Sequence, residues 1–518
     1  MSDIVRQTYV ISDLHLGGVY PENAGAPAPG GATDRGFRIC THAADITQFI
    51  NALAAKPPEN PSIELIVNGD LVDFLAERDP DTGHFTSFNF KQVTAHKKFD
   101  AIVQRDQQIF DALSRFLARG HRLVILLGNH DIELTMPAVR SALAKAVGAG
   151  RGTDYEFVPG GEAYLVGDAL IEHGNRYDKW NMVDHEQLQR VAVSLSRLQP
   201  VVEGCFTPPP GSDMVSKILN PIKENYKFVD LLKPETGAVL PLILTLEPGF
   251  ASIAAKVALI AARLGDAVRV AAGLPPLAPG AALGSDISSG GGMGGGSFGS
   301  DISSGGFDAP AGVTNTPQVS AEDQALNALL AEHLGANAHE VHSVLATNAP
   351  KVGSDISTFG DFIDRKFGFI KLLISSGTDY TSRLGALHAV FSSLQGDKTF
   401  DEGVETAKEY MDAATALASN GIKHVVFGHT HMAKRIPLPS GGFYLNSGTW
   451  ADVMQFPSEV LSGPHDPSFA ALGDFVKKLV TGDFSSYALF RPTYVRLDLA
   501  ADGSVTPALC RYADPKDV

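Results

Sequence analysis

The chain has 518 residues and a formal net charge of −16, with 44% hydrophobic and 19% charged residues. This length predicts two or three domains of about 150 residues each, and the acidic balance argues against a general nucleic-acid binder, whose affinity comes mainly from Lys and Arg.

The three cysteines, Cys40, Cys205 and Cys510, match no metal-binding or redox spacing and give no disulfide framework.

The sequence predicts a cytoplasmic protein without a transmembrane segment. Residues 1–7 lack the basic region and apolar run of a signal peptide. The most apolar stretch, residues 237–264, is interrupted by Pro241, Lys256 and Arg263, which argues against a membrane-spanning helix. Peripheral contact with a membrane stays open.

The first part of the chain alternates predicted strands and helices, which is typical of an α/β fold. A strand is expected over residues 9–11, and an amphipathic helix over 41–55. A second strand follows at 65–67, then a long amphipathic helix over 96–119 and a third strand over 123–127.

The last part of the chain shows the same kind of pattern. A helix is expected over residues 400–418 and a strand over 423–427. A further strand and turn follow at 443–448, and residues 494–499 and 506–512 read as a closing hairpin.

Five short polar motifs follow predicted strands. They are Asp13-Leu14-His15, Gly69-Asp70-Leu71-Val72-Asp73, Gly128-Asn129-His130-Asp131, Glu172-His173-Gly174-Asn175 and Gly428-His429-Thr430-His431. In open α/β sheets, sites form where strands end. Mixed carboxylate, amide and imidazole ligands suit ions such as Mn, Fe or Zn. The motifs therefore predict a metal site at this edge.

This ordered set resembles the calcineurin-like metallophosphoesterase family, over roughly residues 8–185 and 420–455. The resemblance implies a four-layer fold, in which two stacked β-sheets are flanked by helices and hold two metal ions at the strand ends. One ion would be bound by Asp13, His15, Asp70 and His431. The other would be bound by Asp70, Asn129, His173 and His429.

The resemblance also places His130 beside the metals, with Asp73 or Asp131 orienting it. Two ions about 3.5–4 Å apart can activate a water as hydroxide for in-line attack on phosphorus, while a histidine protonates the leaving oxygen. Arg176 is expected either to bind a substrate phosphate or to form a salt bridge with Asp178 or another acid. The predicted function is a phosphatase or phosphodiesterase with two divalent ions per chain, Mn first and Fe or Zn as alternatives.

Between His173 and His429 lie about 255 residues, far more than a crossover connection needs. We therefore predict a helical insertion over residues 186–399, which divides the core into residues 1–185 and 400–518. Because both ends of the insertion adjoin ligand motifs, we expect it to form a cap over the site.

The interior of the insertion has two contrasting segments. Residues 215–274 are apolar and helix-rich, which fits either an apolar or lipid-linked substrate, or packing and a homo-oligomer interface. Residues 272–319 are rich in Gly and Ser and repeat the sequence Gly-Ser-Asp-Ile-Ser-Ser-Gly, which predicts a flexible linker.

Two alternative functions stay open at this point. One is a non-catalytic binding scaffold on the same fold, and the other is a nuclease. A distant similarity to the branch that hydrolyses UDP-diacylglucosamine is weakened by His130, because that branch commonly carries Arg there. The substrate is expected to be a small-molecule or lipid-linked phosphoester.

Overall fold

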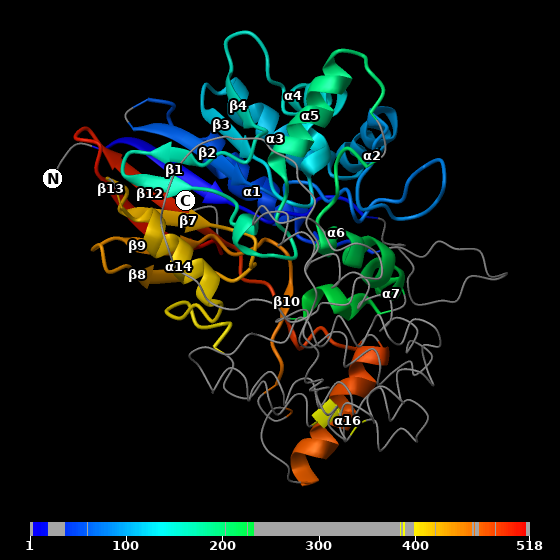
Figure 1. Cartoon of the computed structure of the whole chain (residues 1–518). Coiled ribbons are helices and arrows are strands. Elements are labelled where there is room, and N and C mark those ends of the chain that lie inside the picture. The colour runs from blue at the N-terminus through cyan, green and yellow to red at the C-terminus, as the bar shows by residue number, and fades with distance from the viewer. Residues whose placement is uncertain are drawn as a thin grey trace, which may run out of the picture.

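The structure is a computed structural model in which nine segments and four single positions are described. They are residues 4–18, 37–59, 61–201, 204–224, 226–232, 384, 387, 388, 398–419, 421–457, 460, 466–481 and 483–513, with gaps between them. The predicted linker at 272–319 lies outside the described residues, as does most of the insertion (Figure 1).

The larger sheet has six strands in the order β13-β12-β1-β2-β3-β4. Its central strands, β1 to β4, are parallel, whereas β12 and β13 join antiparallel at one edge as the predicted hairpin. Val10 of β1 pairs with Ile66 of β2. The strands are Ile4–Ile11 (β1), Ser62–Asn68 (β2), Arg122–Leu126 (β3), Asp154–Val158 (β4), Thr493–Ala500 (β12) and Val505–Arg511 (β13).

The smaller sheet has five strands in the order β5-β6-β7-β9-β8, in which β6, β7 and β9 are parallel. It joins strands from before and after the insertion. The strands are Tyr164–Val166 (β5), Ala169–Ile171 (β6), His424–Phe427 (β7), Lys434–Pro437 (β8) and Phe443–Asn446 (β9). A separate short ladder pairs β10 (Val453–Met454) with β11 (Ala488–Leu489).

Alternating apolar residues let each sheet bury both faces. Val10 and Ile66 pack against Val426 and Leu445 of the smaller sheet, which makes the core between the sheets. Their neighbours along the strands, such as Ile11, pack under helices on the outer face. These helices are α1 (Ala43–Ala54), α2 (Gln92–Arg105), α3 (Gln107–Ala118) and α4 (Pro137–Ala146).

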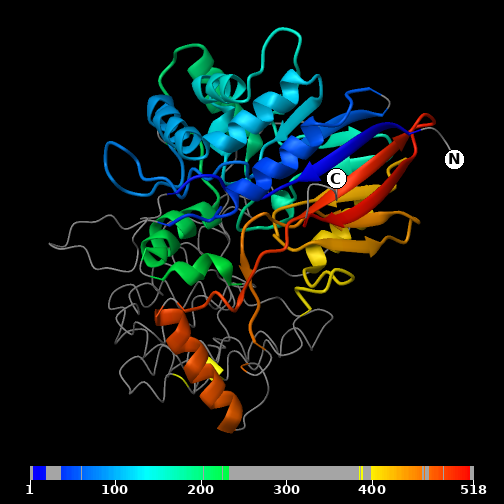
Figure 2. The same ribbon diagram turned by 180° about the vertical axis from the view of Figure 1, so that it is seen from behind.

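The outer face of the smaller sheet is covered by α14 (Lys408–Leu417). Tyr410 and Ala414 of this helix pack against Val425 and Phe427. The layers are therefore helix, sheet, sheet, helix (Figures 1 and 2). The predicted α/β metallophosphoesterase architecture is confirmed.

The helix predicted over 96–119 is two helices, α2 and α3, because the chain breaks at Asp106. The backbone of Asp106 leaves the helical region, with φ −107° and ψ 25°. Its side chain is fully buried and pairs with Arg38, a contact that apolar periodicity does not reveal.

The helix predicted over 400–418 begins only at Lys408. The buried ammonium group of Lys434 accounts for this, since it donates hydrogen bonds of 2.6, 2.8 and 2.7 Å to the carbonyl oxygens of Thr399, Asp401 and Val404. These contacts compete with the i to i+4 hydrogen bonds of a helix. The carbonyl of Asp401 accepts a turn hydrogen bond from the N–H of Val404, and the segment stays a loop.

A second apolar core lies away from both sheets and joins three distant parts of the chain. Phe228 and Val229 come from the start of the insertion, Leu387 comes from its end, and Phe475 lies in α16 (Asp466–Thr481). In both views α16 lies below the sheets (Figures 1 and 2). A helix from beyond the fifth motif thus packs with the insertion, which we did not predict.

The start of the insertion consists of short helices. They are α5 (His185–Ser196), α6 (Pro210–Met214), η3 (Val215–Leu219), α7 (Asn220–Lys223) and η4 (Lys227–Leu231), whereas η1 (Ile132–Thr135) and η2 (Asn175–Tyr177) lie earlier in the chain. Among the described helices, none has the length and apolar character needed to span a membrane. The apolar segment 215–274 is described only to residue 232, so its lipid-binding and homo-oligomer interpretations stay predictions.

Candidate metal centre

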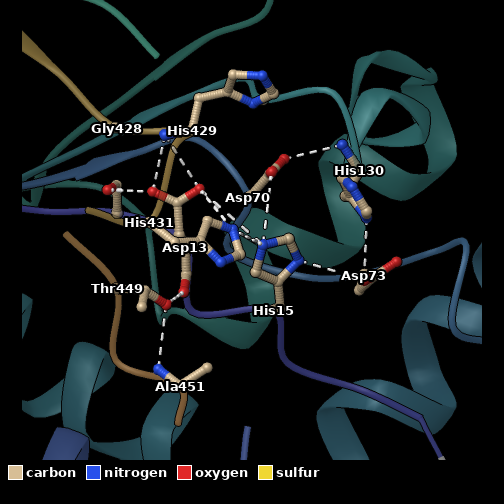
Figure 3. Close-up of polar contacts among 12 residues, drawn as sticks. Asp13, His15, Asp70, Asp73, His130, Gly428, His429, His431, Thr449 and Ala451 are labelled. Atoms are coloured by element: carbon tan, nitrogen blue, oxygen red, sulfur yellow. Dashed lines mark hydrogen bonds and ion pairs between the residues drawn. The ribbon is translucent and has the colours of Figure 1, made fainter. Parts of the chain in front are cut away.

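Loops at the ends of parallel strands bring the predicted ligands together. The strands β1, β2 and β3 end at one edge of the larger sheet, and β6 and β7 end at the adjacent edge of the smaller one. Figure 3 shows Asp13, His15, Asp70, His130 and His431 gathered around one centre.

Five of the predicted ligands have left-handed backbone conformations. The φ angles are 55°, 45°, 52°, 67° and 61° at Asp13, His15, Asp70, His429 and His431. Asp and His adopt this region more readily than most residues, yet it still costs about 1–3 kcal/mol each and clusters at functional sites. The surrounding sheets therefore hold these loops in the conformation that aims the side chains at one point.

Glycines in the motifs allow the loops to approach one another. Gly69 has φ +80°, and a Cβ there would lie 2.3 Å from Nδ1 of His173. A Cβ on Gly128 would lie 2.1 Å from Oδ1 of Asp70. Both distances are far below van der Waals contact, so a larger residue would displace a ligand side chain.

The first donor group consists of Asp13, His15 and His431, whose ligand atoms lie within 4.8 Å of one another. Nε2 of His15 is 3.0 Å from Nε2 of His431, and Nε2 of His431 is 3.4 Å from Oδ1 of Asp13. Thr449 fixes the Asp13 backbone by donating a 2.8 Å hydrogen bond to its carbonyl oxygen (Figure 3). Asp70 adds a carboxylate oxygen 3.7 Å from Nε2 of His15.

The second donor group consists of Asp70, His173 and His429. Nδ1 of His173 lies 2.8 Å from the carbonyl oxygen of Asn68, which fixes the ring with Nε2 facing the centre, 3.3 Å from Oδ2 of Asp70. A further group, His15, Asp70 and His130, links the two, so Asp70 belongs to two of the three donor groups among the described residues.

Unpaired buried atoms at this centre fit a divalent ion. The side-chain oxygen and nitrogen of Asn129 and Nε2 of His173 are buried without a hydrogen-bond partner. Buried polar atoms are normally paired, and atoms left unpaired around one centre are what the ligands of a divalent ion would show. Together with imidazole and carboxylate donors, these atoms make the set that Mn, Fe and Zn accept.

The carboxylates make the centre favourable for positive charge. Burial opposes a charged His173 ring, but Asp70 outweighs it and raises the pKa of His173 to about 10. Burial likewise opposes ionised Asp70, yet the neighbouring His173, His130 and His15 hold its pKa well below its usual range. A bound cation would benefit from the same field.

Asp73 contacts His130, whereas Asp131 does not. Oδ2 of Asp73 is 3.0 Å from Nδ1 of His130 and 3.2 Å from Nδ1 of His15. Burial opposes a charged His130 ring, but Asp73 and Asp70 raise its pKa to about 9.

Asp131 ties two motif loops together instead of orienting His130. Its carboxylate accepts hydrogen bonds from the backbone N–H groups of Gly128, at 2.7 Å, and Leu71, at 2.9 Å. Of the two carboxylates considered for orienting His130, the structure brings only Asp73 to the ring.

Asp178 is a site residue that the sequence did not single out. Its Oδ2 lies 3.1 Å from Nε2 of His429, and it accepts hydrogen bonds from the side chain of Asn181, at 2.6 Å, and the backbone of Trp180, at 2.8 Å. A carboxylate held in this way can fix the orientation of a ligating histidine. The sequence indicated a role for Asp178 near the metals only through its position five residues after His173. We considered Asp178 only as a partner for Arg176.

A cavity of about 360 Å³ opens over the centre. His15, Asp70, His130, His429 and His431 line its floor. Its walls come from the start of the insertion, including Val215 and Leu219, and from the segment that follows it, including Glu405 and Tyr410. The described start of the insertion thus contributes to the cavity wall, and the cap as a whole stays a prediction.

Arg176 lies outside this cavity. Its Nε is 3.4 Å from Oε2 of Glu172, and its guanidinium group donates a 2.5 Å hydrogen bond to the carbonyl oxygen of Gly161. It lines a separate small pocket behind His173. A substrate role for Arg176 therefore has no geometric support here and stays an untested prediction.

Comparison with known proteins found a family model that matches part of the chain. Residues 7–216 match the family model described as calcineurin-like phosphoesterase, a match that extends past residue 185 into the predicted insertion. Neither the curated proteins nor the solved structures gave a significant match. The resemblance to calcineurin-like phosphoesterases, a family of metal-dependent phosphoester hydrolases, is thus confirmed over residues 7–216.

Proposed function

We propose that the protein is a dinuclear metal-dependent hydrolase of small-molecule phosphomonoesters or phosphodiesters. The observation that carries this proposal is the sharing of Asp70 between two donor groups at the floor of one cavity. One ion would be held by Asp13, His15, Asp70 and His431. The other would be held by Asp70, Asn129, His173 and His429.

The ions, when bound, would activate a water and bind the attacking and leaving oxygens of an in-line displacement. We propose Mn²⁺ as the ion, with Fe or Zn as alternatives, because the donor set accepts all three. Asp70 would keep both ions close, and the short Asn68 contact would keep Nε2 of His173 free of a proton for ligation.

His130 would supply the proton for the leaving oxygen. Asp73 holds Nδ1 of the ring, which leaves Nε2 as the atom that can carry a proton towards the substrate. The raised pKa of His130 supports a protonated ring at neutral pH. The backbone N–H of His130 donates a 2.8 Å hydrogen bond to Asp70, so the acid and the shared ligand move together.

The test combines metal analysis with hydrolysis of p-nitrophenyl phosphate and bis(p-nitrophenyl) phosphate. Protein supplied with Mn²⁺ should hold about two ions per chain and cleave at least one ester. A chelator should abolish cleavage and Mn²⁺ should restore it. Two bound ions without cleavage across a broad ester panel would favour the non-catalytic scaffold, and salt-sensitive cleavage of DNA alone would favour the nuclease.

A further inference from the structure

Two lysines line the cavity among the described residues, and they differ in what they can contact. Lys434 donates to three backbone carbonyls, which uses all three hydrogens of its ammonium group. Lys223 lies at the end of α7, in the insertion, and is 3% exposed. Lys223 differs from Lys434 in that it lies on the part of the cavity wall that the insertion contributes, and its charge acts on His130.

The backbone around Lys223 is anchored to the metal-ligand loops. Asn220, also in α7, is fully buried and donates a 2.6 Å hydrogen bond from its side chain to the carbonyl oxygen of Leu75, two residues after Asp73. Lys223 lines the same cavity as His15, Asp70 and His130. The insertion thus places the Lys223 side chain in the lining of the same cavity as His130, the proposed acid for the leaving group.

The environment of Lys223 keeps its charge in place. The ammonium group forms an ion pair with Asp230 of η4 and lies 5.3 Å from the centre of the Phe37 ring. A buried ammonium group needs such partners, because desolvation disfavours its charge. An anionic group entering the cavity would offer a second favourable partner for the same cation.

We propose that Lys223 binds the phosphoryl oxygens of the substrate. This inference rests on the proposed function, since it assumes that the phosphoryl group sits over the two donor groups. Phosphoryl transfer spreads negative charge over several oxygens, and a cation on the cavity wall would stabilise part of that charge beside the ions. The insertion would then take part in catalysis and not only cover the site.

The competing reading is that Lys223 and Asp230 only stabilise the insertion. Under that reading, neutralising either partner has the same effect, because each leaves one buried charge unpaired. Under our proposal the two substitutions change phosphate affinity differently. Loss of Lys223 removes a contact with phosphate, whereas loss of Asp230 removes the carboxylate that competes with phosphate for Lys223.

The experiment measures binding of inorganic phosphate to the Mn²⁺-loaded full chain by isothermal titration calorimetry. Lys223→Gln should weaken phosphate binding about tenfold or more with the Mn²⁺ stoichiometry unchanged. Asp230→Asn should leave the affinity equal or higher, and Lys223→Arg should retain most of it. The matched control is Lys217→Gln, because Lys217 is 52% exposed, pairs with Asp213 and lies outside the cavity lining.

Equal phosphate affinity in wild type and Lys223→Gln would overturn the proposal, as would equal losses in Lys223→Gln and Asp230→Asn. If the single variants misfold, the double variant Lys223→Gln/Asp230→Asn carries no unpaired buried charge. That double variant should still lose phosphate binding, and retained binding would refute the contact.

Failure of wild type to bind Mn²⁺ would overturn the proposed function and this inference together. Bound Mn²⁺ without phosphate binding would overturn only the inference.

Discussion

The candidate metal centre and the apolar core around α16 are both assembled from distant segments, but by different rules. At the centre, polar residues lie directly after strands whose parallel pairing sets their positions. In the second core, Phe228, Leu387 and Phe475 meet mainly through side-chain packing. The backbone pairing there, among the described residues, is the short β10–β11 ladder and a bridge between Leu232 and Met454. The first arrangement leaves a pattern in the sequence, whereas the second leaves only apolar residues that many folds could bury.

The largest effect is expected from Asp70→Asn, because this carboxylate belongs to two of the three donor groups and is the proposed shared ligand. We expect loss of both ions and of detectable hydrolysis, with the fold retained. Metal analysis and circular dichroism check this outcome. The control is Asp100→Asn, at an exposed position of α2. Retention of two ions in Asp70→Asn would refute its role as the shared ligand.

His130→Gln should lower kcat by about 10²–10⁴-fold, which is the usual contribution of a general acid. The Mn²⁺ content should stay near that of wild type, because His130 is proposed as an acid and not as a ligand. His96→Gln, at an exposed site on α2, serves as the control. A loss of Mn²⁺ that matches the loss of activity would instead assign His130 to the metal.

Phe475→Ala should separate the two regions. Phe475 is 1% exposed and packs against Phe456 and Tyr487, with ring centres 5.8 and 5.0 Å away. Removal of such a ring costs about 3–5 kcal/mol of unfolding free energy. We expect this loss in denaturant unfolding with Mn²⁺ binding unchanged, and little effect from Val193→Ala at an exposed site. Parallel loss of Mn²⁺ would show that the second core supports the metal centre.

Asp178→Asn should have the smallest effect of the four. Removal of a carboxylate that orients a ligating histidine typically weakens metal binding about 10–100-fold. Calorimetric titration of metal-free protein with Mn²⁺ should show one weakened site and one unchanged site. Asp184→Asn is a matched control, because Asp184 only caps α5 and Asn caps equally well. Unchanged affinity at both sites would remove Asp178 from the centre.

The same contrast explains how much of the molecule the sequence could predict. Strand-end motifs predicted the sheets and the gathering of Asp13, Asp70 and His173, since parallel strands bring their carboxyl ends to one edge. Periodicity did not reveal the break at Asp106, whose cause is a buried ion pair with a residue 68 positions away. Nor did it reveal contacts that depend on tertiary packing, such as Asp178 with His429.

The left-handed backbones at the ligand positions determine how this centre should be mutated. Alanine at Asp13, His15 or His429 would remove a metal donor and also place a residue poorly suited to this conformation in a strained turn. A conventional alanine scan would therefore mix two effects and overstate the importance of each side chain for metal binding. Asparagine tolerates the left-handed region better. Asparagine variants would thus isolate the chemistry of the side chain from the geometry of the loop.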